Sequence, residues 1–207
     1  TQQGANVGDC LYKDISGPNG EPDGVIDAYD QTVLGSGLPK VNFGLSTHME
    51  YKGFDLNIST YGVLNYHVSD DIYNSLNSCY GYGNKEVGML DANRWSEDGS
   101  TYLSSVPRTY AANNATLGWN DLFSSRKIQN AAYWKIANVE LGYNFPDKWF
   151  GGYVSGVRLY VSAQNLYTFT GYHGYNVDYA GGTFTPGYNF CSFPSARTFM
   201  CGLHFTF

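Results

Sequence analysis

The sequence carries little charge and no long apolar run. Asp, Glu, Lys and Arg make up 14% of the 207 residues, whereas a water-soluble domain usually holds about 25%. A stretch of about 18 apolar residues is missing, which excludes a transmembrane helix. The opening residues also lack the charged start and apolar core of a signal peptide. We therefore expect any export signal to lie on a longer precursor.

Several classes of site are excluded in the same way. The net charge is −6, so the chain offers no basic patch for nucleic acid. The four cysteines show no C-x-x-C spacing, which argues against a zinc site or redox motif. The four histidines are dispersed and a nucleophile elbow is missing, so we predict that the chain is not an enzyme. The sequence leaves open whether two of Cys10, Cys79 and Cys191 form a disulfide, which would require a location outside the cytoplasm.

The sequence does have a clear period of two. Val157, Leu159 and Val161 alternate with Arg158 and Ser162, as in a strand with one apolar and one polar face. The same pattern occurs in five segments: 41–49, 54–64, 133–145, 157–167 and 197–207. These segments are long for a soluble sheet but suit a tilted membrane strand, which needs about 9–11 residues.

The connections between these segments alternate in length. Residues 50–53 and 146–156 make short turns, whereas 65–132 and 169–196 are long loops. Aromatic residues gather near both ends of the segments, where a barrel meets water. We therefore predict an all-β fold, a transmembrane antiparallel β-barrel of which the chain supplies the last strands, about five, with long extracellular loops.

The predicted organisation has two parts. Residues 1–40 form an extracellular loop with an acidic turn, and residues 41–207 form the C-terminal strands of the barrel. The last strand ends in an alternating aromatic pattern with a glycine before it. We interpret Gly202, Phe205 and Phe207 as a signal for the outer-membrane assembly machinery.

Several stretches together resemble the SusC-like branch of the TonB-dependent transporters. In chain order they are Gly8-Asp9, Tyr12-Lys13-Asp14, Asp23-Gly24-Val25-Ile26-Asp27, Leu38-Pro39-Lys40, Tyr51-Lys52-Gly53-Phe54-Asp55-Leu56, Asn93-Arg94-Trp95, Leu141-Gly142-Tyr143, Val161-Ser162-Ala163-Gln164-Asn165-Leu166, Phe169-Thr170-Gly171-Tyr172 and Arg197-Thr198-Phe199. Their order and spacing cover nearly the whole chain.

The resemblance implies a barrel of about 22 strands with a plugged lumen in the outer membrane. It also implies import of oligosaccharides or peptides, with a SusD-like surface lipoprotein over the barrel. TonB would act through an N-terminal part, including the plug, that this chain does not contain. The expected partners are thus the lipoprotein, TonB, outer-membrane lipid and the substrate, and no nucleic acid.

An acidic turn follows the register of a twelve-residue calcium loop. Its oxygen ligands would be Asn19, Glu21, Asp23, Val25, Asp27 and Asp30, with Gly24 at the sharp turn. Asp14, displaced by an insertion, is the alternative to Asn19 as the ligand at the first position of the loop. A structural Ca²⁺ is one reading, and a solvated turn ordered by side-chain hydrogen bonds is the other.

Aromatic residues in the long loops are the candidates for contact with a ligand or a partner protein. They are Trp95, Tyr102, Trp119, Tyr172 and Tyr175. Aromatic rings can stack on sugars or accept peptide side chains, and they can also pack the loops against one another. The alternative to a transporter is a secreted carbohydrate-binding β-sandwich with a structural calcium site.

Overall fold

The structure is a computed structural model, and it describes residues 2–79, 83–88, 95–96, 106–109, 119–150, 154–178 and 182–207. Its helices and strands are η1 (Ala28–Asp30), β1 (Val41–Tyr51), β2 (Phe54–Leu64), β3 (His67–Asp70), α1 (Asp71–Leu76), η2 (Trp119–Asp121), η3 (Ser125–Lys127), β4 (Gln129–Asn130), β5 (Tyr133–Phe145), η4 (Asp147–Trp149), β6 (Gly156–Thr170), β7 (Tyr188–Asn189) and β8 (Thr198–Thr206).

The chain divides into two compact units. The loop body comprises Thr1–Leu34 and Ser69–Ile128, and the strand unit comprises Gly35–Val68 and Gln129–Phe207. No helix in the described part of the chain is long and apolar enough to cross a membrane.

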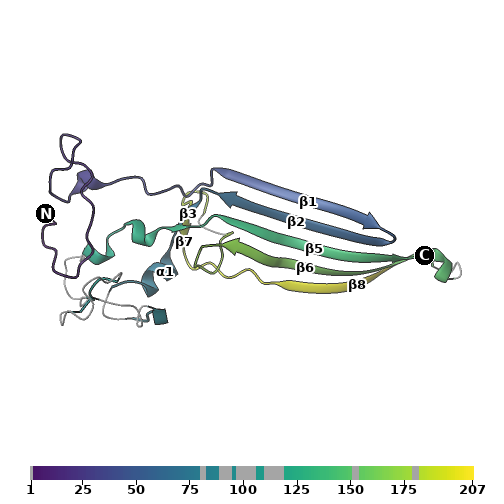
Figure 1. Cartoon of the computed structure of the whole chain (residues 1–207). Coiled ribbons are helices and arrows are strands. Elements are labelled where there is room, and N and C mark those ends of the chain that lie inside the picture. The colour runs from purple at the N-terminus through teal and green to yellow at the C-terminus, as the bar shows by residue number, and fades with distance from the viewer. Residues whose placement is uncertain are drawn as a thin grey trace. The chain divides into compact units, whose positions relative to one another are not determined.

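The strand unit contains a five-stranded sheet in the order β1-β2-β5-β6-β8 (Figure 1). Every neighbouring pair is antiparallel. The five predicted strands are therefore confirmed, with small shifts at their ends. β1 runs on to Tyr51, so the first hairpin turn is only Lys52 and Gly53, whose φ angles are 49° and 87°. Two successive positive φ angles are typical of the type I′ turn that fits the twist of a hairpin.

A bulge in β5 changes which way its first residues point. Asn138 pairs with Ser59 and Ile136 with Thr60, so Ala137 is an extra residue without a partner in β2. The insertion reverses the alternation. It turns Lys135 toward the face that holds Ser59, and it leaves Trp134 on the opposite, apolar face.

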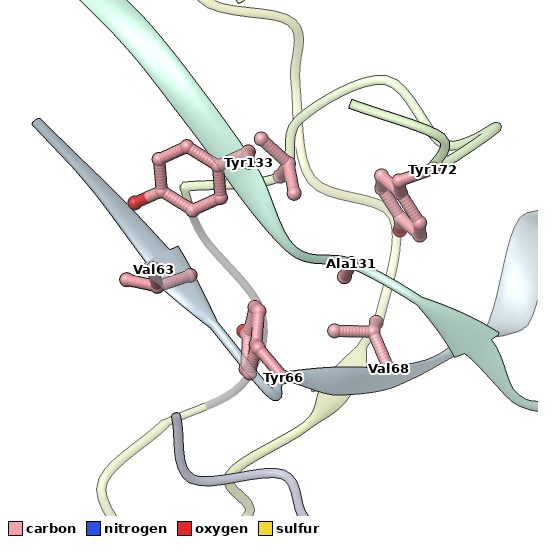
Figure 2. Packing of buried hydrophobic residues seen from close by; sticks show 7 residues of the cluster. Val63, Tyr66, Val68, Ala131, Tyr133 and Tyr172 are labelled. Carbon is pink, nitrogen blue, oxygen red and sulfur yellow. The ribbon is translucent and has the colours of Figure 1, made fainter. Parts of the chain in front are cut away.

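The long loops contain short elements that the periodicity does not reveal. β3 lies between β4 and β7 in a second, three-stranded sheet. Figure 2 shows side chains from the ends of β2 and β5, from β3 and from the loop after β6 pointing toward one another. This buried cluster consists of Val63, Tyr66, Val68, Ala131, Tyr133, Tyr172 and Val177. It anchors the loop after β6 to the end of the long sheet.

Candidate functional site

One face of the long sheet is apolar from edge to edge. Two complete cross-strand rows on this face are Thr47-Ile58-Val139-Ala163-Phe199 and Met49-Leu56-Leu141-Val161-Cys201. Many of these side chains are uncovered: Phe199 is 69% exposed and Val161 is 51% exposed. An uncharged face of this extent is suited to an apolar environment rather than to water.

Aromatic rings form a band at each end of the apolar face. At one end Trp134 and Phe169 stack with their centroids 5.3 Å apart, and Tyr167 lies 4.7 Å from Phe169. At the other end Tyr143 lies 4.6 Å from Phe54. Paired bands of Trp, Tyr and Phe are typical of the two water boundaries of a membrane barrel.

The opposite face, here called the polar face, carries an ion cluster. Arg158 donates from Nε to Asp55 Oδ1 at 3.0 Å and from Nη2 to Asp55 Oδ2 at 2.5 Å. The same Nη2 donates to Glu140 Oε1 at 2.6 Å, and Asn144 donates to Asp55 Oδ1 at 3.1 Å. The Asp55 side chain is only 6% exposed. The two-pronged contact of a guanidinium with a carboxylate is the strongest form of this pair.

Gly142 makes the Asp55–Arg158 contact possible. Asp55 lies on β2 and Arg158 on β6, so their contact crosses β5 above Gly142. A Cβ atom at this position would lie 2.5 Å from Asp55 Oδ1 and 2.6 Å from Arg158 Nη2. The glycine therefore leaves room for an ion pair between two strands that are not neighbours. No local pattern in the sequence predicts this cluster, because the cluster depends on the order and register of three strands.

A second ion pair ties the loop after β6 to the polar face. Lys135 Nζ donates to Asp178 Oδ2, and the Lys135 side chain is 4% exposed. Beside this pair is a cavity of about 320 Å³ whose lining includes both Tyr172 and Tyr175. Tyr172 is buried and its hydroxyl accepts a hydrogen bond from Asn189 at 2.8 Å, whereas Tyr175 is 64% exposed. Of the two predicted contact residues, only Tyr175 presents most of its ring to solvent.

The loop body joins residues that are far apart in the sequence. Arg108 Nε donates to Asp9 Oδ1 at 2.7 Å, and Asn120 Nδ2 donates to the same oxygen at 2.9 Å. The backbone N–H of Cys10 donates to Asn120 Oδ1 at 2.6 Å. Burial alone would raise the pKa of the Asp9 carboxyl, but the hydrogen bonds from Arg108 and from the backbone of Asn6 outweigh it and lower the pKa.

A larger cavity, of about 900 Å³, lies within the loop body. Trp95 and Tyr12 line it, together with Lys13 and Arg126. Trp119 lies nearby, its ring centroid 5.8 Å from that of Tyr12. The volume falls in the range of small-molecule sites. Trp95 and Trp119 are thus brought to one region, while Tyr102 lies outside the described residues.

The acidic turn is closed by carboxylate contacts to backbone N–H groups. Asp14 Oδ2 accepts from Gly24 at 2.6 Å, and Asp30 Oδ1 accepts from Ile15 at 2.7 Å. Hydrogen bonds from the backbone of Asp27 and Ile15 lower the pKa of the Asp30 carboxyl. Asp14 therefore holds the turn closed through the backbone of Gly24, and the choice between Asn19 and Asp14 as first calcium ligand stays a prediction.

Most of the other residues proposed as calcium ligands lie at exposed positions. Asn19 and Glu21 are exposed, as are Asp23, Val25 and Asp27. Within the described residues, no group of three or more His, Cys, Asp or Glu side chains is arranged to hold a metal ion.

Two residues of the predicted assembly signal lie in the edge strand β8, and the third follows it directly. Gly202 pairs with Tyr160, and a Cβ at Gly202 would lie 2.6 Å from that ring. Phe205 is on the apolar face opposite Val157 and is 50% exposed. Phe207 follows β8 and is 91% exposed. Recognition by an assembly machinery remains a prediction.

Two faces of opposite character, long antiparallel strands and paired aromatic bands are typical of the sheet of a transmembrane β-barrel. Solved structures share this fold. The RagAB peptide importer in its closed-closed state matches 90% of this chain and 20% of its own, with a TM-score of 0.70 and 23% identity. Its open-open state matches 82% of this chain with a TM-score of 0.66 and 25% identity.

Sequence comparison finds TonB-dependent receptors similar to this chain. TonB-dependent receptor P3 of Formosa agariphila is 30% identical over 98% of this chain, and TonB-dependent receptor SusC of Bacteroides thetaiotaomicron is 26% identical over 95%. The resemblance to SusC-like TonB-dependent receptors is therefore confirmed over nearly the whole chain. The chain spans about a fifth of these relatives, 19% of each. No family model matches it.

Proposed function

We propose that this chain forms part of the wall of a TonB-dependent importer barrel in the outer membrane. The division of the five-stranded sheet into an uncharged face and an ionic face carries this proposal. The apolar face would contact lipid, with the aromatic bands at the two membrane boundaries. The polar face, with Arg158, Asp55 and Glu140, would line the lumen.

The two outer strands support a barrel made with further strands. Within the described residues, β1 pairs only with β2 and β8 only with β6. Unpaired backbone groups facing lipid cost several kcal/mol each, so an open edge is not tolerated in a bilayer. Both edges would therefore pair with other strands of a longer protein.

A secreted β-sandwich is not favoured by these observations. In a sandwich, a second sheet covers the apolar face of the first. Here Leu45 is 65% exposed and Leu203 is 57% exposed, on two different strands of the long sheet. The strands of the second sheet are between two and four residues long, too short to cover strands of nine to fifteen.

The substrate and partners follow from the relatives. We propose that the whole protein imports oligosaccharides or peptides, that a SusD-like lipoprotein covers it, and that TonB drives release. It would therefore act as a carrier and not as an enzyme. Support comes from the names SusC and RagAB peptide importer, and from the aromatic lining of the cavity beside Trp95.

Fractionation of the full-length protein tests the proposal. We expect it in the outer-membrane fraction, dependent on detergent for solubility, and accompanied by a lipoprotein. A folded barrel should also migrate faster than its heat-denatured form on a gel. A water-soluble, folded protein without detergent would contradict the proposal.

A structural calcium ion in the acidic turn is a separate proposal. The Asp14–Gly24 contact gives the turn the closure of a calcium loop, and Asp14 Oδ1 is buried without a hydrogen-bond partner. Binding would draw Asp23, Asp27 and Asp30 inward. Calcium should then slow proteolysis of the loop body in the native protein but not in Asp14→Asn, and equal rates with calcium and with chelator would contradict it.

A further inference from the structure

The four cysteines differ in where they lie. Cys191 and Cys201 belong to the strand unit, and both are exposed thiols. Cys10 and Cys79 belong to the loop body, in the two segments that compose it. Cys79 is 1% exposed and Cys10 is half-buried. The sequence left open which of the cysteines would pair.

Cys10 and Cys79 flank the same guanidinium group. Arg126 Nη1 lies 3.2 Å from Cys10 Sγ and 3.9 Å from Cys79 Sγ. The two sulfur atoms therefore cannot be farther apart than the sum of these distances. Cys10 lies in a segment without helix or strand, so a disulfide at this position would not disturb a helix or a strand pairing.

Arg126 also favours the chemistry of disulfide formation. The thiolate is the reactive form of cysteine, and a neighbouring cation stabilises it. Burial raises the pKa of the Cys79 thiol, and the contact with Arg126 opposes this only in part. Cys10 is more accessible and closer to the guanidinium, so it is suited to react first.

We propose that Cys10 and Cys79 form a disulfide that joins the two segments of the loop body. This inference rests on the proposed outer-membrane location, because disulfides persist in oxidising compartments. The oxidant is a disulfide-bearing thiol oxidase protein. The Cys10 thiolate attacks one sulfur of the oxidant's disulfide, forms a mixed disulfide and releases one thiolate. Cys79 then attacks Cys10 Sγ and releases the second.

The step is balanced. Cys10 and Cys79 lose two protons and two electrons, and the disulfide of the oxidant becomes a dithiol. The disulfide would add a covalent link to the polar contacts of this region, such as the hydrogen bond from the Cys10 backbone N–H to Asn120. It would close the chain between the first segment and the long loop, which restricts the unfolded state of the loop body.

A peptide map of the full-length protein tests this pairing. The protein is extracted in detergent without reductant, its thiols are blocked with iodoacetamide under denaturing conditions, and its digest is analysed by mass spectrometry. We expect a linked pair of peptides containing Cys10 and Cys79 that disappears after reduction. Cys191 and Cys201 should carry the alkyl group. Alkylated Cys10 and Cys79 before reduction, or a link to another cysteine, would overturn the proposal.

A second measurement does not depend on the map. Reductant should speed proteolysis within the loop body of the native protein on the order of tenfold or more. The same acceleration is expected in a Cys191→Ser, Cys201→Ser control and should be lost in Cys10→Ser, Cys79→Ser. Insensitivity of the native protein to reductant would count against the disulfide. The fraction that contains the protein is determined first. A protein outside the outer membrane would contradict the proposed location, and this result is distinct from the absence of the disulfide.

Discussion

The strand unit and the loop body are stabilised in different ways. The long sheet is joined by regular backbone pairing, and its side chains are sorted by face. The described residues of the loop body form little regular structure, and polar side chains such as Asp9 and Asn120 connect its distant segments. A local pattern in the sequence encodes the first arrangement, whereas the second depends on pairs that no local pattern reveals.

The largest expected effect comes from placing a charge on the apolar face. Val139→Lys should cost about 2–4 kcal/mol, because a cation near the middle of a bilayer is strongly unfavourable. Asn138→Lys is the control, since the neighbouring residue points to the polar face at the same depth. The free energy of unfolding in detergent or lipid distinguishes them. Equal losses would show that the two faces share one environment.

Filling the space above Gly142 should have the next largest effect. Gly142→Val places atoms between Asp55 and Arg158, and overpacking of this kind costs about 1–3 kcal/mol. Gly156→Ala is a fair control, because its Cβ would lie 3.8 Å from Thr206. Thermal unfolding of the barrel reports the difference. A Gly142→Val protein as stable as the control would refute the role given to Gly142.

The loop body should be weakened by losing Asn120. Asn120→Ala removes contacts to Asp9 and to the Cys10 N–H, and unsatisfied buried groups cost about 1–3 kcal/mol. Limited proteolysis should show faster cleavage within residues 1–34 or 69–128, with the strands intact. The control Gln31→Ala changes an exposed residue and should alter neither the cleavage of the loop body nor that of the strands. Cleavage of the strands instead would mean that the two units do not open separately.

The strands were predictable because each needs only a period of two. The bulge at Ala137 was not, since one inserted residue does not disturb the composition of the segment. Its signal was the position of Lys135, which an unbroken alternation would have placed on the apolar face. The contacts of Asp9 with Arg108 and Asn120 join residues about a hundred positions apart. No pattern in the sequence relates such distant residues, so these pairs could not be predicted from it.

Acid should weaken the loop body. The pKa of Asp9 is lower in the folded protein than its ordinary value of about 3.9. A lowered carboxyl pKa contributes stability that is present above the unfolded pKa and lost as pH falls through the folded pKa. Protease sensitivity of the loop body should therefore rise below about pH 4. Asp9→Asn should remove this part of the pH dependence, and an unchanged profile would contradict it.

The smallest expected effect separates two tyrosines of the strand unit. Tyr172→Phe removes the acceptor for Asn189 in the buried cluster and should cost about 0.5–1.5 kcal/mol. Tyr175→Phe changes an exposed side chain and should leave stability unchanged. Thermal unfolding of the two variants measures both. A larger loss for Tyr175 would reverse the roles assigned to these residues.

We expect the apolar face of the long sheet to meet lipid and the polar face to meet water. Spin labels at successive positions of β1, from Leu45 to Met49, test it directly in the full-length protein in lipid, with the native cysteines replaced. Oxygen, which partitions into lipid, should relax the labels at 45, 47 and 49. A water-soluble nickel complex should relax those at 46 and 48. Equal access of the nickel complex to all five positions would contradict the account.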